Sequence, residues 1–418
     1  MNKRLRGKNG ITLVALVITI VILLILASIS IQALTNQGLF KQAQNAKNLT
    51  EEKTSEESAK LYEYEQWLTN YESGKIFTNV DPSKTNPEAA MPTGAILIEG
   101  DATKGIVIKD SSNNEWVWVE VPKTVFKTAT KADEYDKIKA DLITYASTYR
   151  EGKAGQGRYW TDEWYDGCGI ADSSTYTETY NKMLSSVYTN GGFWISRYEI
   201  GDSTTTASNT TRTSSSGTTG IAVSKADQIP YNYVTCSQAQ TLANGMSTDI
   251  NKTSSLLFGI QWDLVCKYLE VNEKWNTTTN TASYYLNTNS TSWGNYKDSS
   301  LTLMRGKYLV GGSDSNTWTA FNVNTENYVT NSQTSSDISY YQILTTGASE
   351  QTNKMNIYDF AGNEWEWTLE HATSDTDYPC AMRGGSCYFD GSDKPASYRN
   401  GGITIDSFIS VGFRSALY

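Results

Sequence analysis

Histidine is almost absent from the sequence, which has one, His371, among 418 residues. This scarcity excludes most histidine-based zinc and iron sites and any relay of several histidines. The five cysteines form no CxxC pair and are odd in number, so they favour neither a disulfide framework nor a zinc site: Cys168, Cys236, Cys266, Cys380 and Cys387. Lys and Arg number 35 against 45 Asp and Glu, and no basic block follows residue 10. We therefore expect no nucleic-acid partner.

Long apolar runs are also rare, and one stands at the N-terminus. Residues 9–40 carry no charge, and Ile11–Leu34 is almost wholly apolar and long enough to cross a bilayer as a helix. Four basic residues precede this run, Lys3, Arg4, Arg6 and Lys8. By the positive-inside rule they predict a cytoplasmic N-terminus. We therefore expect a single-pass membrane protein whose remainder is exported.

The junction Lys8-Asn9-Gly10-Ile11-Thr12-Leu13 resembles the class III leader of type IV prepilins. The resemblance implies cleavage by prepilin peptidase after Gly10, with Ile11 as the mature N-terminus and other pilins as partners. Type IV pilins usually carry Glu at mature position five, where this chain has Ala15, which argues against bulk polymerisation. A plain uncleaved signal anchor is the alternative.

The chain divides into five segments: a leader at 1–10, a transmembrane helix at 11–35, a helical stalk at 36–74, a linker at 75–97 and a head at 98–418. The stalk mixes charges of both signs at helical spacing, and Gly74 is a plausible stop. The linker holds Pro82, Pro87 and Pro92 among small polar residues.

The head has the pattern of an α+β fold with long loops. Apolar residues alternate in 105–108 and 115–121, which predicts a hairpin, and 193–200 predicts another strand. Helical spacing is present in 131–150, 235–246 and 260–269. The Ser/Thr-rich tract 202–219 is predicted to be a surface loop.

The last 60 residues contain AGNEWEW at 361–367, RGGS at 383–386, Tyr398-Arg399 and GFR at 412–414. This order resembles the formylglycine-generating enzyme (sulfatase-modifying factor) family, and weaker likenesses extend the match over residues 98–418. The resemblance implies a C-type-lectin-like fold. Its structural motif residues are Gly362, Asn363, Trp365, Glu366, Trp367, Arg383, Gly384, Gly385, Arg399, Gly412, Phe413 and Arg414.

Several of these residues have a structural interpretation. Gly384 and Gly385 suit a backbone with positive φ or a close approach. The arginines of the motifs, Arg383, Arg399 and Arg414, are expected to pair with Glu366 and Asp359 inside the domain. The family resemblance also implies structural calcium near AGNEWEW, with Asn363 and Glu366 as ligands, against the alternative of internal hydrogen bonding. No cofactor is required.

The enzymes of this family hold copper(I) with two cysteines that fall three and eight residues after the Ser of GGS. Phe389 and Lys394 stand at those positions, and neither can ligate copper. Related sulfoxide synthases need a histidine-rich iron site, which a single histidine cannot form. We therefore expect no catalysis of either kind, and a pocket or buried thiol at Cys387.

The stretch Gly384–Tyr418 resembles the variable region of proteins diversified by retroelements, which implies a changeable ligand surface. Aromatic and short polar residues intersperse here as in binding surfaces, although period-two spacing in 403–409 also suits a core. The candidate ligand-binding residues are Cys387, Tyr388, Phe389, Asp390, Asp393, Tyr398, Asn400, Ile403, Ile405, Phe408 and Ser410.

The function that follows is a cell-surface receptor or adhesin, whose head binds an extracellular protein or glycan. The alternative is a minor structural pilin or pseudopilin on a pilus. A formylglycine-generating oxidase is the third interpretation.

Overall fold

The computed structural model describes residues 13–35, 47, 53, 77–150, 158–247, 249–310, 317–321 and 341–418. Two compact units divide the chain, Met1–Gly74 and Lys75–Tyr418, and each is described by itself. The leader with Gly10 and Ile11, and the stalk apart from residues 47 and 53, lie outside the described residues.

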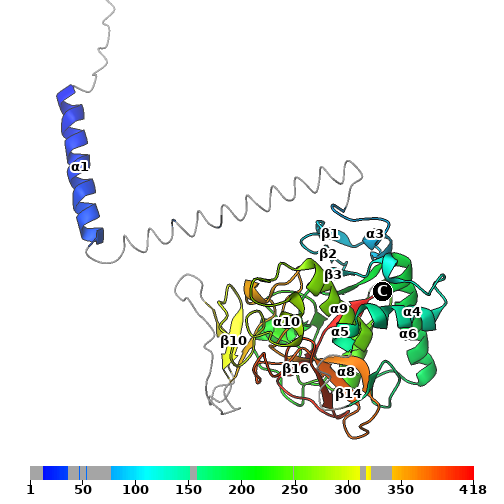
Figure 1. Cartoon of the computed structure of the whole chain (residues 1–418). Coiled ribbons are helices and arrows are strands. Elements are labelled where there is room, and N and C mark those ends of the chain that lie inside the picture. Colours follow the sequence, from blue (N-terminus) through cyan, green and yellow to red (C-terminus); the bar gives the residue numbers. More distant parts are fainter. Residues whose placement is uncertain are drawn as a thin grey trace, which may run out of the picture. The chain divides into compact units, whose positions relative to one another are not determined.

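The N-terminal unit contains helix α1 (Leu13–Thr35) (Figure 1). The large apolar side chains between Leu16 and Leu26 are exposed. Within the part of the chain that the structure describes, no helix has both the length and the apolar character needed to cross a membrane.

The head is built on two larger sheets, and the first has six strands in antiparallel contact. Their order is β1 (Ile96–Glu99), β2 (Val107–Lys109), β3 (Glu115–Glu120), β5 (Gly192–Ser196), β17 (Ser415–Leu417) and β9 (Ser254–Leu256). The predicted hairpin is confirmed, since Val107 pairs with Val117 across β2 and β3. The last strand, β17, lies between β5 and the edge strand β9, so the C-terminal residues are buried inside the sheet.

The second sheet carries the C-terminal motifs. Its order is β15 (Arg399–Gly402), β14 (Cys380–Arg383), β13 (Trp365–Ala372) and β16 (Val411–Phe413), and β4 (Trp160–Thr161) also pairs with β13. Strands β13 and β16 are parallel. Arg414 alone separates β16 from β17, so the chain passes directly from this sheet into the first one.

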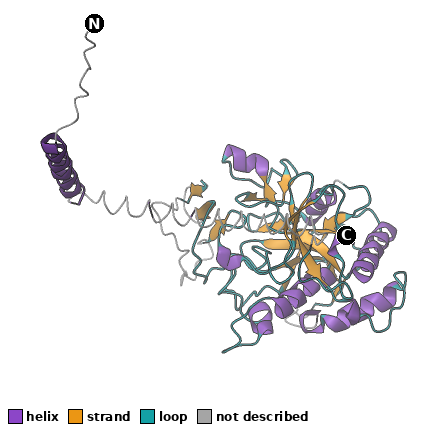
Figure 2. Ribbon diagram, turned by 90° about the horizontal axis from the view of Figure 1, so that it is seen from above, coloured by secondary structure: helices purple, strands orange, loops and turns teal. Residues whose placement is uncertain are grey.

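Two three-stranded sheets are peripheral to these. One is β11 (Thr319–Ala320), β10 (Lys307–Val310) and β12 (Gln342–Leu344), and the other is β7 (Ala222–Val223), β6 (Gly201–Asp202) and β8 (Ile229–Pro230). Helices surround the sheets (Figure 2). They are α3 (Pro87–Ala90), α4 (Tyr135–Tyr145), α5 (Ser147–Arg150), α6 (Ser173–Asn190), α7 (Ser203–Ser208), α8 (Cys236–Asn244), α9 (Gly259–Asn272) and α10 (Ala282–Asn287), with 3-10 turns η1 (Lys123–Val125) and η3 (Glu350–Thr352).

The helices predicted at 235–246 and 260–269 are confirmed as α8 and α9. Thr235 and Gln238 form a capping box at the start of α8, which fixes its first turn. The helix predicted at 131–150 is broken at Ala146 into α4 and α5. The strand predicted at 193–200 ends at Ser196.

The tract 202–219 is more ordered than a surface loop. Asp202 caps helix α7 and forms a buried ion pair with Arg212, which is 1% exposed. The predicted surface position is confirmed, since Asp202 and Arg212 are the only buried residues of the tract, but Ser203–Ser208 form helix α7 instead of a loop.

The head also begins before residue 98. Thr85 is buried and donates to Gly191 O at 2.8 Å, and Trp194 Nε1 donates to Ala90 O at 3.0 Å. Residues 77–97 therefore pack on the head instead of forming an extended linker.

Candidate functional site

The candidate surface is the segment between β14 and β16, at residues 384–410 (Figure 1). It leaves β14, forms β15 at one end of the sheet, and re-enters the sheet at β16. Arg383 pairs with Arg399 across β14 and β15, and Val411 pairs with Trp365 across β16 and β13. Both arms of the segment therefore start from paired strands of one sheet, the interior strand β14 and the edge strand β16.

Two glycines turn the chain as it leaves β14. Gly384 and Gly385 have φ of 92° and 79°, as expected from the sequence, because side chains rarely adopt this region. A Cβ on Gly385 would overlap the carbonyl oxygen of Lys394 and the ring of Tyr296. Tyr296 Oη also donates to Gly384 O at 2.7 Å, which fastens the turn.

A group of six charges, called here the core charge network, lies next to β14 and β15; five of its side chains are 0% exposed and that of Arg150 is 10% exposed. It consists of Arg150, Arg383, Arg399, Asp162, Asp263 and Glu370. Three positive and three negative charges balance one another. The network joins β14 and β15 to α9, α5 and β13.

The arginines of the network make charge-assisted bonds with good geometry. Arg399 donates from Nη2 to both Asp263 oxygens at 2.7 Å, and Arg383 donates from Nη2 to Asp263 Oδ1 at 2.8 Å. Both arginines also contact Glu370 at 3.0 Å. Burial raises the pKa of Asp263, but the guanidinium groups outweigh it, and the pKa lies below its usual value.

The predicted partners of Arg383 and Arg399 are therefore wrong. Glu366 is occupied by Arg414, and Asp359 accepts from Gly347 N at 2.6 Å and Thr352 Oγ1 at 2.8 Å. Asp263 and Glu370 are closer in the fold, although Asp263 is more than 100 residues away in sequence.

The predicted pairing of Arg414 with Glu366 is confirmed. Arg414 donates to the two Glu366 oxygens at 3.0 and 3.1 Å, and to the carbonyls of Ser196 and Tyr358 at 2.8 and 2.7 Å. This fully buried guanidinium joins β13 and β5 at the point where the chain leaves β16.

A second buried acidic group lies near the AGNEWEW segment. Burial raises the pKa of Glu366 to about 7 and the pKa values of Glu199 and Glu364 well above their usual range. Asn363 donates from Nδ2 to Glu199 Oε2 at 2.6 Å. Glu364 Oε1 accepts from Asn232, while its Oε2 has no partner among the described residues.

The expected calcium ligands already have protein partners. Asn363 Oδ1 accepts from Leu344 N and Asn295 Nδ2, both at 2.9 Å, and both Glu366 oxygens accept from Arg414. Among the described residues, no group of three or more His, Cys, Asp or Glu is arranged to hold a metal ion. Calcium binding stays a prediction.

Two of the candidate ligand-binding residues belong to the interior. Cys387 is 1% exposed and packs in a cluster with Ile229, Leu309, Trp318 and Ile343. Tyr398 is 8% exposed, and its hydroxyl accepts from Lys394 Nζ at 2.9 Å. Cys387 is thus the buried thiol that the sequence also predicted, and neither side chain is exposed to solvent in this structure; a ligand contact by either residue stays a prediction.

Tyr388 and Phe389 lie half-buried between the interior and the surface. The Tyr388 ring stacks on Tyr341 with centroids 4.3 Å apart, and Phe389 meets Trp365 edge-on at 5.8 Å. Tyr341 extends the candidate surface, and sequence reasoning missed it because it lies in a polar stretch far from the motifs.

The remaining candidates face solvent wholly or in part. Ile405 is 76% and Phe408 51% exposed, and both stand on the loop between β15 and β16. Asp390 and Asp393 are exposed, whereas Asn400, Ile403 and Ser410 are half-buried. The loop backbone is held by Tyr233 N, which donates to Phe408 O at 3.1 Å, and by Asn232 Nδ2, which donates to Ile409 O at 2.8 Å. Two large apolar side chains exposed together on such a loop make it a candidate contact surface.

Phe389 and Lys394, at the positions where the sequence resemblance places copper ligands in the enzymes, both pack on aromatic rings. Phe389 packs on Trp365, and the Lys394 ammonium lies 4.1 Å from the Tyr398 ring centroid. All five cysteines are buried free thiols, and burial raises the pKa of Cys387 well above its usual value.

The chain is similar to one known protein family. Residues 170–417 match the family described as sulfatase-modifying factor enzyme 1-like domain. The match spans more than half of the chain, which therefore belongs to this family. No curated protein matches the chain.

Two solved structures show weak likenesses. The first is Treponema denticola variable protein 1, at 18% identity over 54% of this chain and 84% of that one, with a TM-score of 0.27. The second is titled "Crystal Structure of CarF", at 15% identity over 72% of this chain and 85% of that one, with a TM-score of 0.19.

Proposed function

We propose that the chain is a surface-displayed, non-catalytic binding protein, a receptor or adhesin whose head contacts an extracellular protein or glycan. The observation that carries the proposal is the exposure of Ile405 and Phe408 on a loop whose two flanking strands are held in one sheet. An exposed apolar pair costs solubility, and a fixed loop reduces the ordering entropy lost on binding.

The test is binding by the full-length chain to an array of defined glycans and to immobilised collagen, fibronectin and mucin. Truncating Ile405 and Phe408 to Ala should weaken capture by about 1–4 kcal/mol for each anchor and leave the melting temperature unchanged. Ile221→Ala is the matched control, because Ile221 is 62% exposed on another part of the head. An equal loss of binding in the control, or no loss of binding in the Ile405 and Phe408 variants, contradicts this binding site.

Catalysis is tested separately. We propose that the chain converts no sulfatase peptide to formylglycine, because Phe389 and Lys394 offer no thiolate. Purified full-length chain with copper(I) and oxygen should leave the peptide cysteine intact. Copper-dependent conversion that Cys387→Ser abolishes would overturn this part of the proposal.

The anchor is proposed to be the apolar N-terminal segment, cut by prepilin peptidase between Gly10 and Ile11. Its support is the charge-free apolar run after a basic leader. A minor pilin is the alternative, and immunogold labelling separates the two: label along filaments favours the pilin, and label on the cell body favours the receptor.

Diversification by a retroelement is proposed for the segment 384–418. The support is its sequence resemblance to retroelement-diversified variable regions. A reverse-transcriptase gene beside a near-copy of the final hundred bases is the expected finding. Its absence from the neighbouring DNA would contradict this origin.

A further inference from the structure

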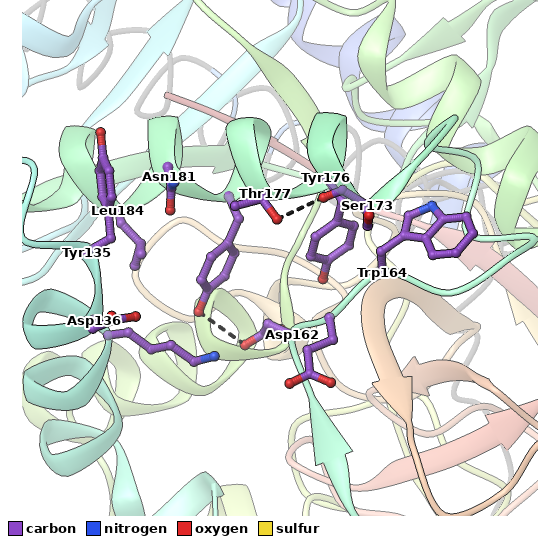
Figure 3. Close-up of a pocket in the computed structure, with 12 residues that line it drawn as sticks. Tyr135, Asp136, Asp162, Trp164, Ser173, Tyr176, Thr177, Asn181 and Leu184 are labelled. Carbon is purple, nitrogen blue, oxygen red and sulfur yellow. Dashed lines mark hydrogen bonds between the residues drawn. The ribbon is translucent and has the colours of Figure 1, made fainter.

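A separate cleft of about 380 Å³ lies between helices α4 and α6 and the segment after β4 (Figure 3). It contains no residue of the segment 384–410. Its walls combine aromatic rings, carboxylates and small polar groups. The lining residues are Tyr135, Asp136, Lys139, Asp162, Glu163, Trp164, Ser173, Tyr176, Thr177, Tyr180, Asn181 and Leu184.

Two tyrosines on successive turns of α6 give the cleft an aromatic wall. The rings of Tyr176 and Tyr180 are 19° from parallel, with centroids 6.4 Å apart. Both are buried, and their hydroxyls point inward, Tyr176 to Leu369 O at 2.7 Å and Tyr180 to Asp162 Oδ2 at 3.5 Å. The wall is therefore fixed before any ligand arrives.

The carboxylates of the cleft are of two kinds. Asp162 is buried and held by Arg150 and by the backbone N–H groups of Gly259 and Ile260. Asp136 and Glu163 are exposed, and neither forms an ion pair with another described residue. The free negative charge is therefore at the rim.

A lysine of the protein itself, Lys139, lies against this aromatic wall. Lys139 Nζ lies 5.6 Å from the centroid of the Tyr180 ring, within the range of a cation–π contact. Lys139 also forms no ion pair with another described residue, and its side chain is only half-buried. An ammonium group thus already stands against the aromatic wall on a flexible stem.

We propose that this cleft binds an organic ammonium ion, supplied by a free polyamine or by a lysine side chain of a peptide. The tyrosine ring faces attract a cation, and Asp136 and Glu163 offer carboxylate partners on the rim. Anionic ligands would meet the two unpaired carboxylates of Asp136 and Glu163 against one ammonium, since the charge of Asp162 is balanced by Arg150. The ligand competes with Lys139 for the aromatic wall. Removing the lysine should therefore raise the affinity for the ligand, whereas removing a rim carboxylate should lower it.

The experiment is isothermal titration of the full-length chain with cadaverine, with the peptide Gly-Lys-Gly, and with glucose as an uncharged probe. Binding of cadaverine or the peptide with one-to-one saturation is expected, and the tighter of the two identifies the source. Lys139→Met should tighten binding about three- to tenfold, whereas Asp136→Asn and Glu163→Gln should each weaken it by a similar factor.

Glu178→Gln is the matched control, because Glu178 is an exposed carboxylate on α6 outside the cleft, paired with Lys182 at 2.8 Å. It should leave the affinity unchanged. The proposal is overturned by equal weakening in the control, by weaker binding in Lys139→Met, by absence of binding to both cations, or by binding of glucose alone. These variants touch no residue of 384–410, so the outcome is independent of the proposed ligand surface.

Discussion

Replacing Asp263 with Asn tests the idea that the core charge network is held by charge balance. Asp263 accepts from Arg150 at 3.2 Å, from Arg383 at 2.8 Å and from Arg399 at 2.7 Å. The substitution removes one of three negative charges and keeps the shape of the side chain. It also turns an amide N–H₂ toward guanidinium groups that can only donate.

The expected cost follows from burial. The side chains of Asp263, Arg383 and Arg399 are 0% exposed, so water cannot solvate the excess positive charge. Removing one partner of a buried ion pair costs about 3–5 kcal/mol, a large part of the 5–15 kcal/mol by which domains are stable. We expect a loss of about that size in the free energy of unfolding.

Urea unfolding of the full-length chain, followed by circular dichroism, measures the loss. Glu178→Gln is the control, because its exposed pair with Lys182 is worth well under about 1 kcal/mol. In the double variant Asp263→Asn/Arg383→Met the network is neutral again, so its cost should be less than the sum of the two single costs. Additive costs, or a loss below about 1 kcal/mol for Asp263→Asn alone, would refute the charge-balance argument.

Three further predictions concern other parts of the chain. Burial raises the pKa of Glu364 in the folded state above its ordinary value of 4.5. Above pH 4.5 the unfolded chain releases a proton that the folded chain keeps, so the free energy of unfolding should fall as the pH rises. Glu364→Gln should flatten this decline by up to about 1.4 kcal/mol per pH unit in urea titrations between pH 5 and 8, and an unchanged slope would contradict the assignment. Gly385→Ala should destabilise by more than Gly94→Ala, because both have positive φ but a Cβ at Gly94 meets open space; equal melting temperatures would count against a rigid turn. Edman sequencing of the membrane fraction should read Ile11 first, and an intact Met1 in a host with active prepilin peptidase would rule out the processing.

Local signals in the sequence predicted part of the fold well. Helical spacing in 235–246 predicted α8, and alternating apolar residues predicted β2 and β3. Helix α6 was not predicted, although Asp172 caps its start and Gly191 ends it in the left-handed region. Its buried residues follow helical spacing, but the many Ser and Thr between them hid the pattern: Tyr176, Tyr180, Met183, Leu184 and Val187.

The sequence did not predict which residues distant along the chain pair with one another. The motif arginines were expected to be buried and paired, and they are, but only Arg414 has the expected carboxylate. Asp263 lies on α9, 120 and 136 residues from the arginines that it binds, and no spacing rule connects such positions. Tyr341 joins the candidate surface through the same kind of contact, a ring stacked on Tyr388 from a distant segment.

The uneven burial of side chains in the segment 387–410 also limits which of its positions could vary in a diversified surface. Replacing buried Cys387 or Tyr398 would open a cavity or leave Lys394 without its ring, and such core changes cost several kcal/mol. Ile405 and Phe408 are exposed, and surface substitutions usually stay within about 0.5 kcal/mol. Sequences of this segment from related strains should therefore differ mainly at the exposed positions. Variation that is as frequent at Cys387 and Tyr398 as at Ile405 and Phe408 would show that selection for a stable head does not shape this surface.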